Sequence, residues 1–324
     1  MIKNLIKSVI KGSLLLALLL VLSLLFLIYK SFSPEAFSIV GNLNKFYLSL
    51  AVICLFLVHT FDNARLFIIS RALGIKYSFL YGYITSLVNT FGATVTPAHI
   101  GGEGMAVYML LRKGISAHRV ATAVTFKTVT GMVFFILSFP FLILQTIKNP
   151  KNLLNLFLIA SILIIFTPFF FTSLKKFLRK KGKEGLGFKL RKFLIKYLGA
   201  IKFFYRRKKA EFLLASLSSI GLYVSFLSIA FFLLLSFGKE VSPVEIFSLQ
   251  LGLLYAIFVS PTPGGSGVGE IGGYVVFANL LSQGEVGVFV LLWRFISQYF
   301  SALLGGILFF ICLVLDTKRY LKVY

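Results

Sequence analysis

The stretch Ser260-Pro-Thr-Pro-Gly-Gly-Ser-Gly-Val-Gly-Glu270 decides the fold. It lies between two apolar runs, residues 246–259 and 271–281, and neither run is long enough to cross a bilayer alone. Two prolines and four glycines in eleven residues cannot continue a helix. Broken backbone at membrane depth is tolerated only where protein buries it or where it lines a watery cavity. The stretch therefore predicts a re-entrant hairpin, and Thr94-Val-Thr-Pro-Ala-His-Ile-Gly-Gly-Glu-Gly104 predicts its partner.

The composition indicates an all-α polytopic membrane protein. The chain has 324 residues, 58% of them apolar, and a mean hydropathy of +0.92, which soluble domains of this size do not reach. The formal charge of +24 is uneven, because residues 175–209 hold fifteen Lys and Arg against one acid, Glu184. This block lies between hydrophobic spans, so it predicts a cytoplasmic loop on anionic lipid and no nucleic-acid partner. The cysteines, Cys54 and Cys312, lie in apolar runs and support neither a disulfide nor a metal site, and we expect no cofactor.

Hydropathy and charge together predict six full transmembrane helices and two re-entrant hairpins. The apolar runs are residues 13–29, 46–69, 79–95 with 105–111, 118–147, 153–174, 212–237, 246–281 with its break, and 286–315. Basic residues flank the runs at the N-terminus, 71–76, 112–119, 175–209 and the C-terminus, so all these segments are predicted to be cytoplasmic in the cell membrane. Each broken run must then begin and end on one side, and the two enter from opposite faces.

The order of elements predicts an inverted-topology repeat within one integral membrane domain, residues 1–324. Repeat A covers about residues 46–147, a basic cytoplasmic loop covers 175–210, and repeat B covers about 212–315. Glu103 and Lys127 are 24 residues apart, as are Glu270 and Arg294. Many transporters build a site near the bilayer midplane from such repeats.

Residues 190–204 of the basic loop form an amphipathic pattern, with apolar residues at helical spacing and Lys or Arg between them. The pattern predicts a helix in the membrane interface. It serves either as a topology determinant alone or in lipid sensing.

Ionisable residues within the apolar runs are the candidates for function, because each costs about 2.5–3.5 kcal/mol to insert. Asp62 and Arg65 form either a local ion pair at the interface or an accessory part of a site. Lys127 and Arg294 either pair with Glu103 or Glu270, or bind substrate, or do both.

The hairpin tips supply a second argument for a binding site. The returning half-helices are expected to begin near Gly101 and Val268 with unsatisfied backbone N–H groups, which favour anions. Glu103 and Glu270 would then cap these helices, bind a substrate amine or exchange a proton. The remaining predicted substrate-binding residues are Gly101, Gly102, Gly264, Gly265, Gly267, Pro261 and Pro263, with His99 as an accessory candidate.

Motifs of soluble enzymes do not fit this chain. Gly267-Val-Gly-Glu-Ile-Gly272 matches the dinucleotide fingerprint, but no strand of a βαβ unit precedes it. No enzyme constellation is present in the sequence, so we expect a protein that is not an enzyme.

At Pro261-Thr-Pro-Gly-Gly-Ser-Gly-Val-Gly-Glu270, with Arg294 downstream and Gly101-Gly-Glu103 upstream, the chain resembles the lysylphosphatidylglycerol synthase transmembrane family. This family includes the membrane half of the multiple peptide resistance factors, and the resemblance covers about residues 46–315. It implies a lipid flippase or flippase-like protein, and the best-known members move an aminoacylated phosphatidylglycerol between leaflets. The soluble aminoacyl-transfer domain is absent, so we expect no synthesis of aminoacyl lipid.

Two departures from the family pattern leave the head group open. Many relatives have an arginine three residues after the first acid, where this chain has Ala106, and an arginine is common at the position of Lys127.

The sequence therefore predicts a flippase-like transporter of a membrane lipid with an anionic, phosphate-containing head group. The alternatives are a secondary transporter of a small soluble anion, an enzyme acting on a lipid-linked substrate, and a non-transporting assembly protein. The sequence does not determine the oligomeric state, and a homo-oligomer is one of the possibilities.

Overall fold

The computed structural model describes residues 34–96, 99–148, 197–204, 206–260 and 262–323, and within these ranges the chain is helical without strands. The principal elements are α2 (Pro34–Gly41), α3 (Lys45–Ala72), α4 (Phe79–Val95), α5 (Ile100–Leu111), α6 (Ala117–Lys148), α9 (Lys209–Ser236), α10 (Pro243–Val259), α11 (Val268–Phe277), α12 (Gln283–Arg294), the π-helix η2 (Phe295–Tyr299) and α13 (Phe300–Val323).

Four segments of the described chain are long and apolar enough to cross a membrane: Lys45–Ala72, Ala117–Leu144, Lys209–Ser236 and Gln283–Lys318. They match four of the six predicted spans. The other two predicted spans, residues 13–29 and 153–174, lie outside the described residues. The helices Ile100–Leu111, Pro243–Val259 and Val268–Phe277 are apolar but shorter, as the sequence predicts for halves of broken segments.

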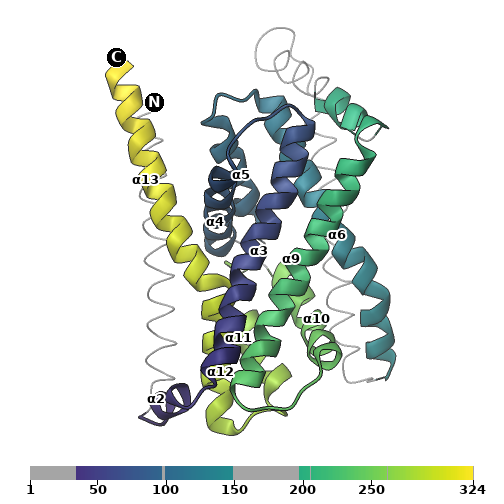
Figure 1. The fold of residues 1–324 in the computed structure, drawn as a ribbon, viewed down its shortest axis with the longest axis vertical. Helices are drawn as coiled ribbons and strands as arrows, with labels where there is room; N and C mark the ends of the chain where they lie inside the picture. Colours follow the sequence, from purple (N-terminus) through teal and green to yellow (C-terminus); the bar gives the residue numbers. More distant parts are fainter. Residues whose placement is uncertain (1–33, 97–98, 149–196, 205, 261, 324) are drawn as a thin grey trace.

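The two pairs of shorter helices lie at opposite ends of the molecule. Figure 1 shows α4 and α5 beside the upper half of α3, and α10 and α11 beside the lower half of the bundle. Helix α3 packs along α9, and α4 packs against both α5 and α13. Two serines fix where the short pairs start, because Ser78 Oγ accepts from Tyr81 N at 3.2 Å and Ser242 Oγ accepts from Glu245 N at 3.2 Å.

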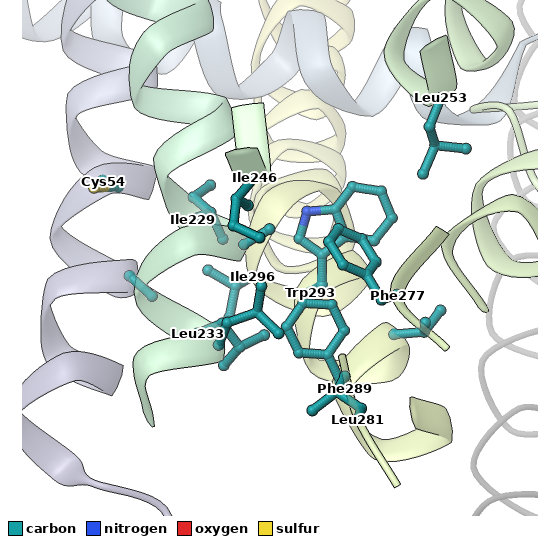
Figure 2. Packing of buried hydrophobic residues seen from close by; sticks show 14 of the residues in the cluster. Cys54, Ile229, Leu233, Ile246, Leu253, Phe277, Leu281, Phe289, Trp293 and Ile296 are labelled. Atoms are coloured by element: carbon teal, nitrogen blue, oxygen red, sulfur yellow. The ribbon is translucent and has the colours of Figure 1, made fainter. Parts of the chain in front are cut away.

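An aromatic cluster holds α11 and α12 against the α3–α9 pair. Phe277 of α11 contacts Phe289 of α12, with ring centroids 4.7 Å apart, and Trp293, at 5.9 Å. Figure 2 shows these rings beside Ile229, Ile246 and other aliphatic side chains. Buried aromatic pairs of this geometry stabilise a fold beyond their area alone. The cluster thus gives the second short pair a rigid support.

Helix α13 packs closely on α4 because two glycines of α13 face α4. A Cβ at Gly305 would lie 2.0 Å from the backbone oxygen of Leu87, and one at Gly306 would lie 3.1 Å from the Phe91 ring. Small residues let helix backbones approach in this way in membranes. At the far end of α5, Arg112 Nη2 and Nε bind the two carboxylate oxygens of Asp316 in α13 at 2.8 and 2.9 Å. Helix α13 therefore holds the first short pair along its length.

The predicted amphipathic helix lies mostly outside the described residues. Residues 197–204 are helical, and Phe204 is fully buried with its ring stacked on Phe126 of α6, centroids 4.1 Å apart. Ile201 packs against the same cluster. In the described part, Ile201 and Phe204 therefore pack on the bundle, whereas Leu198 is exposed. The location of this helix in the membrane interface stays a prediction.

The Gly305 contact gives a test of the packing. Gly305→Ala should lower the free energy of unfolding by about 1–3 kcal/mol, because the backbone of α4 cannot yield to a methyl group. Gly287→Ala is the matched control, since a Cβ at this helical glycine meets nothing within 4 Å and alanine favours a helix by about 0.5–1 kcal/mol. Thermal unfolding in detergent measures both. Equal melting temperatures for the two variants would contradict the close α4–α13 crossing.

Candidate functional site

The two helix breaks meet inside the bundle. Gly264 N donates to Thr96 O at 3.4 Å. Gln298 Nε2 donates to Thr94 Oγ1 and to Gly264 O, each at 3.1 Å. Gly264 has φ +59°, and a Cβ there would lie 2.6 Å from Gln298 Nε2 and 2.9 Å from Thr94 O. Only glycine fits this position, so the contact between the tips is built into the sequence.

The first tip carries a residue in an unusual backbone conformation. His99 has φ 58°, a left-handed geometry that non-glycine residues adopt infrequently and that concentrates at functional sites. Its ring stacks on Phe258 of α10, with centroids 5.1 Å apart and planes 19° from parallel. The imidazole also lies within electrostatic range of Arg294. His99 therefore joins the first tip to the second half of the chain.

Arg294 is the buried cation of the second half. It is 1% exposed, and its Nε donates to Glu270 Oε1 at 2.9 Å while its Nη2 donates to Gly264 O at 3.0 Å. Glu270 Oε1 also accepts from the Tyr299 hydroxyl, and its Oε2 accepts from Gly267 N at 2.6 Å. Every oxygen of this carboxylate is thus used, both as the cap of α11 and as the partner of Arg294.

The π-helix η2 sets the directions of these side chains. It follows Arg294 directly and contains Gln298 and Tyr299, which both contact the second tip. A π-helix adds a residue to one turn and often occurs at functional sites. Gly269 completes the arrangement, since a Cβ there would lie 2.8 Å from Arg294 Cζ. The guanidinium can therefore lie directly against the first turn of α11.

A second group of charges lies between α3, α6 and α9. Asp62 Oδ1 accepts from Arg65 Nη2 at 2.5 Å and lies 3.5 Å from Lys127 Nζ. Arg65 Nη1 donates to Ser219 Oγ at 3.4 Å, whereas its buried Nε has no partner. Lys127 is 2% exposed. One carboxylate thus serves two buried cations, and the contact to Lys127 is the long one.

Glu103 lies near this group without completing it. Its carboxylate is within electrostatic range of Arg65 and Tyr223, but its buried Oε2 has no hydrogen-bond partner. An ammonium has three donors, and the described residues offer Lys127 only the long contact to Asp62. Lys127 and Glu103 therefore keep hydrogen-bonding capacity for a ligand.

These contacts show which of the predicted ion pairs form, and substrate binding by the same residues stays a prediction. The predicted pair of Arg294 with Glu270 is confirmed. Lys127 also pairs within its own repeat, but its partner is Asp62 and not the predicted Glu103. The local Asp62–Arg65 pair is confirmed, and both side chains are buried within the bundle, at 8% and 7% exposure. Asp62 lies on the face of α3 that α6 covers. This position explains both the contact of Asp62 with Lys127 and the burial of the Asp62–Arg65 pair.

The expectation of unsatisfied N–H groups at the tips is wrong for several donors. Gly101 N donates to Thr96 Oγ1 at 2.8 Å, and Gly102 N donates to His99 O at 3.2 Å. In the second tip Gly267 N binds Glu270. Buried donors without water must find protein partners, and polar side chains near each break supply them. An anion site at the tips would therefore depend on side-chain donors more than on the backbone N–H groups of the helix N-termini.

The other predicted tip residues have packing roles in the structure. A Cβ at Gly101 would lie 2.6 Å from Gly92 O, and one at Gly102 would lie 2.9 Å from Asn89 Oδ1, so both glycines let α5 pack on α4. Gly265, with φ +67°, faces Ile257 in the same way. Gly267 and Pro263 are exposed, and Pro261 lies outside the described residues. A role of these residues in binding stays a prediction.

The family follows from comparison with known proteins. The family model described as "Lysylphosphatidylglycerol synthase TM region" matches residues 14–305. The chain belongs to this family. Among curated proteins, it is similar to a "UPF0104 membrane protein" of Archaeoglobus fulgidus, with 24% identity over 261 residues, which cover 75% of this chain and 79% of the relative. The apolar helices and the family together make this a multi-pass membrane protein, and the family indicates a function connected with membrane lipids.

Sequence reasoning missed three polar residues of this member of the synthase TM-region family. Gln298 joins the tips, Tyr299 binds Glu270, and the Tyr223 hydroxyl lies near Arg65. All three lie outside the charged residues and the Gly-Pro tips from which the sequence predicts the site. A glutamine within an apolar span, four residues after Arg294, is itself a signal, because an unpaired amide is also costly there.

A double-variant cycle tests whether Arg294 and Glu270 act as one unit. Glu270→Gln and Arg294→Met should each cost about 3–5 kcal/mol of stability, because each leaves a buried charge without its partner. The double variant should cost clearly less than the sum, as measured by denaturant unfolding in detergent. Lys239→Met is the control, since the Lys239–Glu285 pair at 2.9 Å is partly exposed and such pairs contribute about 0–1 kcal/mol. Additive losses at Arg294 and Glu270 would disprove the unit.

Proposed function

We propose that this protein is a flippase-like transporter, without enzymatic activity of its own, that moves a lipid with an anionic, phosphate-containing head group between membrane leaflets. The observation that supports this most strongly is Lys127. Its ammonium is buried and, within the described part of the chain, has one polar contact, at 3.5 Å, to a carboxylate that Arg65 already binds at 2.5 Å. A buried cation with donors to spare is costly unless a ligand uses it.

We further propose the topology on which this transporter depends. Helices α4 and α5 form one re-entrant hairpin, and α10 and α11 form the other, each within an inverted repeat, with six full spans and cytoplasmic termini in the cell membrane. The lengths support this, since 17 residues of α4 or α10 rise about 26 Å at 1.5 Å each, short of the roughly 30 Å hydrocarbon core. The opposite placement of the two pairs in Figure 1 supports it as well.

The charged residues have different roles in the proposed transport. Lys127 binds the phosphate of the head group, and Glu103 accepts a hydrogen bond from an amine or hydroxyl on the same head group. Arg294 and Glu270 hold the second tip in shape, with Gln298 as the bridge to the first. When the tips part, the head group crosses between them while its tails stay in lipid. Gly101 N and Gly267 N keep their hydrogen-bond partners when the tips part, because each partner belongs to the same half of the chain.

Reconstitution tests the proposal. Lys127→Met should slow the movement of fluorescent phosphatidylglycerol between leaflets of proteoliposomes by about ten- to hundred-fold, since a hydrogen bond to a charged group contributes about 1.5–3 kcal/mol. Arg294→Ala should abolish the movement. Lys239→Met, at a partly exposed ion pair, should leave the rate unchanged.

The same vesicles separate the other functions. Uptake of inorganic phosphate without lipid movement would favour the soluble-anion transporter. Full lipid movement in folded Lys127→Met would contradict the proposed phosphate site.

A further inference from the structure

A groove outside the charged site lies between α6, α9 and α10. Its volume is about 280 Å³, close to the lower end of small-molecule pockets. Its lining residues come from the second half of α6, the middle of α9 and the first half of α10: Phe134, Ser138, Phe141, Val224, Leu227, Val244, Phe247 and Leu251.

The groove offers a ligand only apolar surface. Among the described residues that line it, Ser138 is the one polar residue. Its hydroxyl is already engaged with the Tyr255 hydroxyl at 3.0 Å and the Phe135 carbonyl at 3.4 Å. Tyr255 in turn donates to the same carbonyl. A soluble anion or a polar head group would therefore find no partner in the groove, whereas a hydrocarbon chain would fit its chemistry.

The groove is open on one side and closed at its floor. Val244, Phe141 and Val224 are exposed at the rim, whereas Leu227 and Leu251 are buried beneath them. The exposed apolar rim suits contact with lipid. A chain entering from the bilayer would thus leave lipid neighbours for protein neighbours without meeting water.

The buried end of the groove leads to the charged group. Phe134 stacks on Tyr223, with centroids 4.6 Å apart and planes 22° from parallel. The Tyr223 hydroxyl and Arg65 Nη1 both lie over Gly131, where a Cβ would be 3.8 and 2.7 Å from them. One aromatic pair therefore separates the apolar groove from the cations around Asp62.

We propose that this groove binds one acyl chain of the lipid whose head group lies at the Lys127 site. The inference rests on the proposed function and narrows the substrate to an acylated lipid, because a soluble anion would make no favourable contact in an apolar groove. The first carbons lie near Tyr223, and the chain runs past Leu251 toward the rim at Val244. The glycerol of the lipid then lies beside the Phe134–Tyr223 pair, with the head group on one side of it and the acyl chain on the other.

Photolabelling tests the groove directly. Phosphatidylglycerol with a diazirine midway along one acyl chain is added to proteoliposomes of phosphatidylcholine that hold the full chain. Label should concentrate on α6 and α10 at the groove, and excess unlabelled phosphatidylglycerol should displace it. Val224→Trp and Val244→Trp fill the rim and should reduce the label at least fivefold. Leu217→Trp is the control, because Leu217 lies two turns earlier on the same face of α9 and is exposed like Val224.

The outcomes distinguish this site from the transport proposal. Displaceable groove label in a protein that moves no lipid would support the groove and defeat the proposed function. Lipid movement at the full rate in Val224→Trp, with no label at the groove, would overturn the groove and leave the proposed function standing. Uniform labelling of all lipid-facing helices that unlabelled phosphatidylglycerol does not displace would indicate annular lipid only. This result would also overturn the groove.

Discussion

Backbone that leaves a helix inside a bilayer must find its hydrogen-bond partners in the protein. In this chain each break supplies partners for the other. The amide of Gly264 donates to the carbonyl of Thr96, and Gln298 binds a group from each tip. The glycines at the breaks, the stacked His99 and the π-helix after Arg294 all follow from bringing the two tips to one place. The contact between the tips also forms the protein interior in which the charged residues are buried.

The two halves use their charges differently. In the second half Arg294, Glu270 and Tyr299 satisfy one another and fix the tip. In the first half Asp62 is shared between Arg65 and Lys127, and Glu103 keeps a buried oxygen without a partner. A fully satisfied buried network rigidifies a structure, whereas a buried polar group without a partner is costly. In the proposed transporter, the second repeat therefore holds the structure of its tip, and the first repeat binds the head group.

Sequence reasoning recovered much of this arrangement and failed in identifiable places. Hydropathy and the Pro-Gly breaks located the helices, because membrane insertion leaves few alternatives to a helix. The equal spacing of Glu103–Lys127 and Glu270–Arg294 suggested equal pairs, but only the second forms. Pairing depends on which helix covers which face, and α6 places Lys127 against Asp62 of α3. Periodicity within one segment carries no information on that choice.

The central claim is that the two tips meet halfway across the membrane. Its most direct test is a spin–spin distance in nanodiscs between labels at Ile100→Cys and Ser266→Cys, with both native cysteines replaced by alanine. Ile100 is exposed in the first turn of α5, and Ser266 lies in the second tip. The structure predicts one narrow, short distance, well under half of the roughly 30 Å hydrocarbon thickness. A distance near that full thickness would place the tips on opposite surfaces and contradict the account.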